Sequence, residues 1–451
     1  MRDIQIDERV KLMTMPMDLV SEEAFERRKD ECRTASCGEL YDLSTGVPPF
    51  PVPDVLVNAL KENAHRGKYS SPQGIQELRE AIAGYNKRHF DLDVDPSRIV
   101  IGNGTMGIMY LLFSIIDGHV LLPAPSWPGY LPMVTVLGKS YHILPTRREE
   151  DYKLSPEHLD RMGSQLEGGQ HLLVLNNPHN PTGTLYSRKE LEALATVCRE
   201  RNILVLADEI YALLTYGGEG FTSMGTIYPE GTFVTNGMSK DRSAAGWRFG
   251  HCIMPETSSS QMSGAFAELA SAMYSNVSTP TQYAAVTAYS PSKEIDEYMA
   301  VNREIYRMVG TYMATRLGDI EGVDVMPPKG AYYVLGDFNP SAERLSAFEV
   351  KTSRDLMNFL IEPGINVATL SGDTCLLDAG DLKLRISFVD FDGGAAIRSY
   401  LERRPSTRGE ERAFVEDRAP HISKGLDSVQ SFLEGLRKAE APRPMARVMP
   451  F

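Results

Sequence analysis

The chain has 451 residues, a length that predicts two or three domains and a large hydrophobic core. Its hydrophobic content of 42% and charged content of 24% are typical of a globular protein, and a net charge of −13 without a long basic run argues against a nucleic-acid partner. We find no apolar run of membrane-spanning length, no signal-peptide core in the charged N-terminus, and no metal-ligand spacing among the five cysteines. These features predict a cytoplasmic protein with reduced cysteines, no membrane partner and no metal site.

Short apolar runs alternate with helical patterns through the first two thirds of the chain. The runs cover residues 99–101, 120–122, 141–144, 172–175, 203–207, 233–235 and 249–253. Alternation of this kind is typical of an α/β fold in which helices cover both faces of a mostly parallel sheet. We therefore expect a three-layer αβα domain around a seven-stranded sheet.

The character of the sequence changes after about residue 300. A long helical pattern leads into shorter apolar runs, which predicts a second, smaller α+β domain. We place an N-terminal arm at 1–45, the large domain at 46–300, and the small domain at 301–405, joined by part of the N-terminal segment. Residues 406–451 then form a linker, an amphipathic helix and a loose tail.

Lys240 and Arg248 lie in the Gly-containing segment that follows the run at 233–235. A lysine just past a strand end packs poorly, but the turn can hold its amine over a cleft. A deprotonated lysine attacks carbonyl groups to form imines, and an arginine forks onto phosphate. Taken alone, the pattern is also explained by an exposed lysine and a loop arginine that have no functional role.

Polar residues also follow two other predicted strands. Asp208 directly follows the run at 203–207, and a carboxylate there needs a cationic partner, either structural or in a ligand. Tyr211 lies three residues further on, and Asn180 lies in a turn with two Asn-Pro pairs after the run at 172–175. Because open α/β sheets bind ligands at the carboxyl ends of their strands, we expect these side chains to meet in one cleft.

Three further features fit a cleft of this kind. The stretch at 102–107 opens an apolar helix, whose first N–H groups form an anion site. Trp127 is one of two tryptophans and lies in a loop, either as a core residue or as a platform for a flat ring. Arg385 stands alone in an apolar run and needs an anion, for which a carboxylate is the best bidentate match.

From about Tyr41 to Arg403 these motifs resemble, in order and spacing, the class I/II aminotransferases of the fold-type I pyridoxal-phosphate enzymes. The resemblance implies pyridoxal 5'-phosphate as cofactor and an internal imine on Lys240. It implies that Asp208 pairs with the pyridine nitrogen and that Tyr211 and Asn180 contact the ring hydroxyl oxygen. Trp127 would stack on the ring.

The same resemblance assigns the cofactor's phosphate to six residues. These are Gly104, Thr105 and Met106, then Ser239, Arg248 and, from the neighbouring subunit, Tyr69. Arg385 would grip the α-carboxylate of the substrate, with the loop around Gly46 over it and Asn180 beside it. The resemblance thus implies a homodimer with shared active sites, acting on a small amino acid by a ping-pong transamination.

The sequence departs from the family pattern in places that concern the substrate. Gly237 replaces a common serine three positions before the lysine, which removes one phosphate contact. Ser271 stands where dicarboxylate-specific members have an arginine, so an acidic substrate side chain lacks its clamp unless another residue such as Arg242 supplies one. The region after Val367 also departs from the usual loop.

Two other functions remain open from the sequence. Elimination, replacement or cyclisation on an amino acid or an S-adenosylmethionine-like substrate begins with the same chemistry, and the Ser-Lys-Asp at 239–241 resembles the aminocyclopropane-carboxylate synthases. A non-catalytic ligand sensor on this fold usually carries a DNA-binding module ahead of it. Residues 1–40 are too short and not basic enough for one.

Overall fold

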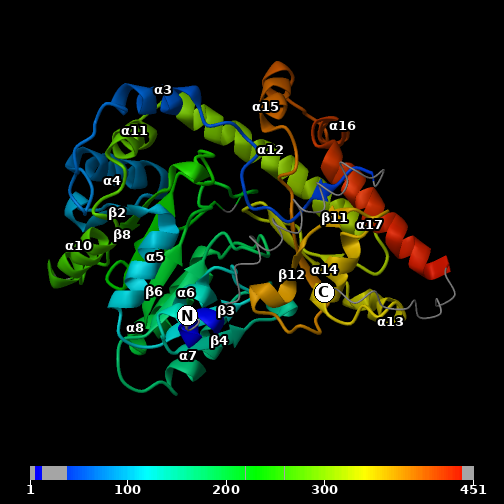
Figure 1. Ribbon diagram of the computed structural model, residues 1–451, viewed down its shortest axis with the longest axis horizontal. Coiled ribbons are helices and arrows are strands. Elements are labelled where there is room, and N and C mark those ends of the chain that lie inside the picture. The colour runs from blue at the N-terminus through cyan, green and yellow to red at the C-terminus, as the bar shows by residue number, and fades with distance from the viewer. Residues whose placement is uncertain (1–5, 13–37, 219, 259, 439–451) are drawn as a thin grey trace, which may run out of the picture.

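A computed structural model of the protein describes residues 6–12, 38–218, 220–258 and 260–438, and it has two layered parts joined by one long helix (Figure 1). Most of the predicted N-terminal arm and the end of the predicted tail lie outside these residues. Within the described part, a short helix α1 (Glu8–Leu12) lies beside α6 (Tyr130–Val136). No helix of the described residues is long and apolar enough to cross a bilayer.

The large part is built on a seven-stranded sheet in the order β2-β8-β7-β6-β5-β3-β4. All seven predicted runs are strands of this sheet, and only β8 is antiparallel to its neighbours, so the predicted mostly parallel sheet is confirmed. The strands are β2 (Ile99–Asn103), β3 (Val120–Ala124), β4 (Tyr141–Pro145), β5 (Leu172–Asn176), β6 (Leu204–Asp208), β7 (Thr232–Gly237) and β8 (Phe249–Ile253).

Helices cover both faces of this sheet, which explains why its central strands are apolar on both sides. On β5, for example, Leu172 and Val174 belong to one core, and Leu173 and Leu175 belong to the other. The first face carries α5 (Gly104–Ile115), α6 and α10 (Ser260–Tyr274). The second carries α4 (Gln76–Phe90), α7 (Pro156–Gly163), α8 (Arg188–Glu200), α9 (Met224–Ile227) and α11 (Thr279–Tyr289), with α3 (Asp54–Asn63) packed on α11.

Helix α12 (Lys293–Gly318) runs from the large part into the smaller one, where a four-stranded sheet has the order β12-β13-β10-β9. The strands are β9 (Asp324–Val325), β10 (Tyr333–Asp337), β12 (Leu370–Ser371) and β13 (Lys383–Ser387). A separate two-stranded sheet pairs β1 (Tyr41–Asp42) with β11 (Val367–Ala368), so the N-terminal segment packs into the smaller part. Its other helices are α13 (Ala342–Ser346), α14 (Ser353–Leu360) and α15 (Gly393–Glu402).

The C-terminal stretch differs from its prediction at one point. The predicted linker contains the start of a helix, α16 (Arg408–Arg418), whose first turn is capped by the Thr407 side chain. Glu411 of α16 forms an ion pair with Arg307 on α12, which holds the helix against the molecule. The predicted amphipathic helix is α17 (Pro420–Lys438), and it buries Leu426, Val429 and Leu433.

Candidate functional site

The carboxyl ends of the parallel strands open on a cavity of about 320 Å³ between the two parts. Most of the predicted site residues line it, although they come from six separate segments of the chain. The predicted residues on its wall are Gly46, Thr105, Met106, Trp127, Asn180, Asp208, Tyr211, Ser239, Lys240 and Arg248. Its volume is in the range of small-molecule sites in proteins.

Lys240 follows β7 and reaches across the cavity to the loop that follows β1. Its Nζ donates a hydrogen bond of 2.7 Å to the carbonyl oxygen of Gly46. It also lies 5.7 Å from the ring centroid of Tyr211 and 5.5 Å from that of Tyr332, so aromatic faces surround the amine. This position leaves the lysine on the cavity wall, as the sequence predicted.

Asp208 ends β6 and is buried beneath the same cavity, with 5% of its surface exposed. Burial raises the pKa of its carboxyl to about 6, while a hydrogen bond from Tyr130, the backbone N–H of Ile210 and the charge of Lys240 lower it. The Tyr130 hydroxyl donates to Oδ2 over 2.5 Å. The carboxylate is therefore poised for a cationic partner in the cavity, as its place at a buried strand end requires.

Tyr130 was missed by the sequence analysis. It opens α6 three residues after Trp127, and the two rings meet edge to face with centroids 5.0 Å apart. The spacing from a loop tryptophan into an apolar helix was the available signal. Tyr333, which also lines the cavity, was missed as well. The sequence carries no signal for it, because Tyr332 and Tyr333 look like ordinary aromatic residues at the start of an apolar strand.

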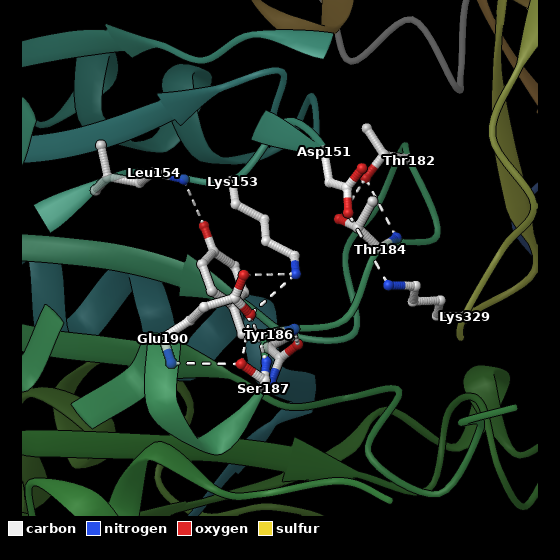
Figure 2. Close-up of polar contacts among 10 residues, drawn as sticks. Asp151, Lys153, Leu154, Thr182, Thr184, Tyr186, Ser187, Glu190 and Lys329 are labelled. Carbon is white, nitrogen blue, oxygen red and sulfur yellow. Dashed lines mark hydrogen bonds and ion pairs between the residues drawn. The ribbon is translucent and has the colours of Figure 1, made fainter. Parts of the chain in front are cut away.

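The loop that carries Asn180 is held rigidly by its own polar groups. The backbone N–H of Asn180 donates to Oδ1 of Asn176 over 2.7 Å, and that of Tyr186 donates to Oδ1 of Asn177. Figure 2 shows the end of this loop, where the Tyr186 hydroxyl accepts from the backbone N–H of Leu154 and leads into α8. The loop therefore presents the Asn180 amide at a fixed point of the cavity.

The start of α8 and the neighbouring part of the chain complete this support (Figure 2). Ser187 and Glu190 form a capping box, and Lys153 donates to both carboxylate oxygens of Glu190 over 2.9 Å. Lys329, from the smaller part, lies 3.9 Å from Asp151. None of these residues lines the cavity, so they support the loop and α8 rather than the chemistry of the site.

The N-terminus of α5 and Arg248 meet at one corner of the cavity, which we call the α5–Arg248 corner. A β-carbon at position 104 would lie 2.6 Å from Nη2 of Arg248, so glycine is required for the guanidinium to approach the first turn. Thr105, Met106 and Ser239 line the cavity beside this corner. Helix N–H groups and an arginine fork together suit a phosphate group.

Arg385 lies just behind the cavity wall, in strand β13. It is 1% exposed, its Nη2 donates to the carbonyl oxygen of Ser44 over 2.7 Å, and its guanidinium lies 4.7 Å from the ring centroid of Tyr333. Tyr333 shares a hydroxyl contact of 3.2 Å with Tyr211. The arginine therefore lies next to the loop around Gly46, which lines the cavity.

Two residues lie elsewhere. Tyr69 is 87% exposed and lies on the outer surface, so this chain does not bring it to its own cavity. Arg242 cannot clamp a substrate as the sequence allowed, because it is fully buried, paired with Asp241 at 2.9 Å and enclosed between the rings of Tyr85 and Tyr289. Arg242 is therefore structural, and its positive charge is paired with the carboxylate of its neighbour Asp241.

The arrangement fits pyridoxal phosphate on four grounds. The α5–Arg248 corner suits the phosphate, and the buried Asp208 carboxylate suits a cationic ring nitrogen. The side-chain oxygen of Asn180 is buried without a hydrogen-bond partner among the described residues, so its amide has capacity for a ligand. Lys240 supplies the amine that a carbonyl cofactor requires.

Comparison with known proteins agrees with this chemistry. The family described as "Aminotransferase class I and II" matches residues 39–392. The chain is 33% identical over 329 residues to a probable aspartate/prephenate aminotransferase of Aquifex aeolicus, covering 71% of this chain and 81% of that protein. It is 30% identical over 347 residues to an asparagine–oxo-acid transaminase of Streptococcus mutans, covering 74% and 84%.

Solved structures give the same answer. A double mutant of Thermus thermophilus aspartate aminotransferase superposes with a TM-score of 0.77 and 26% identity, covering 96% of this chain and 100% of that one. The predicted resemblance is therefore confirmed, and these relatives do not favour the elimination or cyclisation alternative. The chain belongs to the class I and II aminotransferase family and is a fold-type I, pyridoxal-phosphate-dependent enzyme that transaminates amino acids.

Proposed function

We propose that the cavity between the two parts is the transamination site and that Lys240 both carries the cofactor and moves the substrate proton. The observation that carries the proposal is the placement of Lys240, Asp208 and the α5–Arg248 corner around one space. Lys240 can bind the aldehyde of the cofactor, Asp208 its ring nitrogen, and the α5–Arg248 corner its phosphate. When bound, pyridoxal phosphate supplies an electron sink for the charge that develops at the substrate's Cα.

Asp208 tunes this sink by charge. An ionised carboxylate beside the ring nitrogen favours the protonated nitrogen, since an opposite charge nearby raises the pKa of a cationic group by roughly 1–3 units. The hydroxyl of Tyr130 holds the carboxylate in place and favours its ionised form. Tyr211 and Asn180 are assigned to the ring hydroxyl oxygen, and Trp127 to the face of the ring.

Lys240 performs the proton transfer. With the cofactor and an amino acid bound, the Lys240 amine on the cavity wall would be the base that takes the proton from the substrate's Cα and the acid that returns it. Its present partner, the Gly46 carbonyl, belongs to the loop assigned to the substrate. Tyr332 donates to the same carbonyl over 2.6 Å, so that oxygen keeps a partner when the lysine leaves.

Arg385 is assigned to the α-carboxylate of the amino acid, with Gly46 and Asn180 beside it. Among the described residues that line the cavity, the cationic side chains are Lys240 and Arg248, and both have other roles. With Arg242 buried, Arg248 is the one arginine among the described residues that lines the cavity, so none remains there to clamp a second carboxylate. The named relatives act on aspartate, prephenate or asparagine, and for this chain we propose an α-amino acid whose side chain needs no such clamp.

We also propose that the active unit is a homodimer, with the large domain at 46–300 and the small one at 301–405. We assign residues 68–71 and 273–276 to the subunit contact, and they lie side by side, because the Asn276 side chain donates to the Ser70 hydroxyl over 3.1 Å. Large apolar side chains are exposed there, with Tyr69 at 87% and Met273 at 53%. An exposed apolar patch of this kind suits a partner surface.

Replacing Lys240 with alanine tests the proposal. The variant should lose the visible absorbance of lysine-bound cofactor and the production of keto acid, because Lys240 is the one lysine among the described residues that line the cavity. Lys189→Ala, at an exposed position on α8, is the matched control and should keep both signals. Retained absorbance in Lys240→Ala would remove the lysine from its role, and amino-acid consumption without keto acid would favour elimination.

A further inference from the structure

The connection from β13 to α15 crosses the segment that leads into and out of the cavity loop. We call residues 44–47 the substrate loop. At its start, the backbone N–H of Asp42 donates to Oδ2 of Asp390 over 2.8 Å. At its end, the ring of Phe50 meets the ring of Phe391 edge to face, with centroids 5.7 Å apart. Two successive residues of the connection therefore contact both flanks of the loop.

Gly393 adds a contact that depends on the absence of a side chain. A β-carbon at this position would lie 2.5 Å from the carbonyl oxygen of Pro49 and 2.7 Å from Cα of Phe50. These are backbone atoms, so they move only if the chain moves. At the next residue, Gly394, a β-carbon would meet only side-chain atoms of Arg398 and Asp392, each at 3.4 Å. The structure thus requires glycine at 393 and not at 394.

Helix α17 holds this connection from behind. His421 places Nδ1 3.1 Å from Oδ2 of Asp390 and Nε2 3.1 Å from Oε1 of Glu39, and its ring lies edge-on to Tyr41. Lys424 donates to the other oxygen of Glu39 over 2.7 Å. Helix α17 therefore fixes both Asp390 and the strand β1 that precedes the loop.

Hydrogen bonds from Asp42 hold the start of the substrate loop, which other hydrogen bonds join to Arg385 and Lys240. Oδ1 of Asp42 accepts from the N–H groups of Ser44 and Thr45 and from the Ser44 hydroxyl. The Ser44 carbonyl accepts from Arg385, and the Gly46 carbonyl accepts from Lys240. A shift of Asp42 therefore moves the groups assigned to the amino acid.

We propose that residues 390–393, anchored by His421, form a clamp that positions the substrate loop for amino-acid binding. The clamp rests on the proposed function of the loop, and its members are positioning residues because none of them lines the cavity. The α5–Arg248 corner and Asp208, at the end of β6, lie on other elements, and none of the clamp contacts described above involves them. Its loss should therefore weaken amino-acid binding more than cofactor binding.

Gly393→Ala in the holoenzyme tests the clamp directly. We expect KM for the amino acid to rise about tenfold, with kcat and cofactor affinity within about twofold of the wild type, because the added methyl displaces the backbone of residues 49–50. Gly394→Ala is the matched control and should leave all three unchanged. If the two variants behave alike, or if Gly393→Ala lowers cofactor affinity as much as amino-acid affinity, the clamp is wrong.

His421 provides a second variant that does not add bulk. His421→Leu removes both polar contacts and should raise KM, whereas His421→Asn keeps a donor near the Nδ1 position and should restore KM most of the way. The unfolding midpoint of each variant is measured alongside, since a purely structural role would move the midpoint and leave KM alone. An unchanged KM in His421→Leu would overturn the anchor. A wild-type protein that makes no keto acid would instead contradict the proposed function.

Discussion

Asp208 shows how one buried carboxyl group is prepared for a ligand. Its pKa is raised to about 6 by burial, against a usual value of 3.8, and the Tyr130 hydroxyl and the charge of Lys240 only partly offset this. A buried anion without a cation is costly, so the site is stabilised when a cationic ring nitrogen arrives. In the proposed site, Asp208 would therefore both tune the cofactor and favour its binding.

The pH dependence of cofactor binding should report this group. In the cofactor-free protein Asp208 is protonated below pH 6, so affinity for pyridoxal phosphate should rise as the pH is raised through about 6. The raised pKa has the opposite effect on the stability of the cofactor-free fold. The folded state holds the Asp208 proton more tightly than the unfolded state, so this contribution to the free energy of unfolding is complete below pH 3.8 and is lost as the pH rises through about 6. Titrations of cofactor affinity and of unfolding free energy measure the two trends.

Asp208→Asn is the control for both titrations, because asparagine has no proton to lose in this range. It should bind the cofactor weakly, with the Asp208-dependent step near pH 6 removed from each curve. An unchanged step in the variant would assign the titration to another group, and the proposed pairing with the ring nitrogen would lose its support.

At the scale of elements, the antiparallel pairing of β7 with β8 explains the glycine at position 237, where the sequence departs from the family pattern. The sequence has Gly237 where many members have serine, and the last residue of β7 lies against β8. A β-carbon at position 237 would lie 2.7 Å from the carbonyl oxygen of Phe249. Position 237 therefore has no room for a serine side chain, because β8 lies against the end of β7 just before the segment that carries Lys240 and Arg248.

Gly237→Ser should therefore destabilise the protein rather than restore a phosphate contact. We expect a loss of about 1–3 kcal/mol in the free energy of unfolding, because overpacking forces the strands apart. Gly246→Ser is the control, since a β-carbon there meets nothing within 4 Å. Denaturant unfolding of the cofactor-free protein gives both values, and a Gly237→Ser variant as stable as Gly246→Ser would show that β8 gives way freely.

For the whole molecule, the proposed homodimer depends on the exposed surface around Tyr69. Residues 68–71 and 273–276 form one surface, held by Asn276, Gln282 and Thr279 side chains that contact Lys68 and Ser70. Tyr69 points away from the cavity of its own chain. The proposal therefore requires a second copy whose Tyr69 completes each site.

Mixing two inactive subunits tests this sharing. Lys240→Ala and Tyr69→Phe each damage one side of the site, so a mixed dimer should contain one intact site made of Lys240 from one chain and Tyr69 from the other. Activity after co-refolding should exceed the sum of the separate variants. Tyr141→Phe, at an exposed position on β4, replaces Tyr69→Phe as the control and should be active unmixed. Strictly additive activity would place Tyr69 outside the site.

The sequence by itself determined the seven strands and the polar residues at their ends, because apolar runs and turn residues act locally. Lys240, Asp208 and Asn180 could be predicted together, since the carboxyl ends of parallel strands meet at one edge. The same local logic misassigned the start of α16 as a linker, because Pro405 and the charged residues after it say nothing of the Glu411–Arg307 contact.

Only the tertiary structure decided which partners distant segments meet. It placed Tyr130 on Asp208, enclosed Arg242 between Tyr85 and Tyr289, and laid Gly393 on the backbone of residues 49–50. None of these contacts has a periodic or turn signature, because each joins segments far apart in the chain. The strand ends set where the chemistry is found, and the packing of remote side chains sets how precisely it is held.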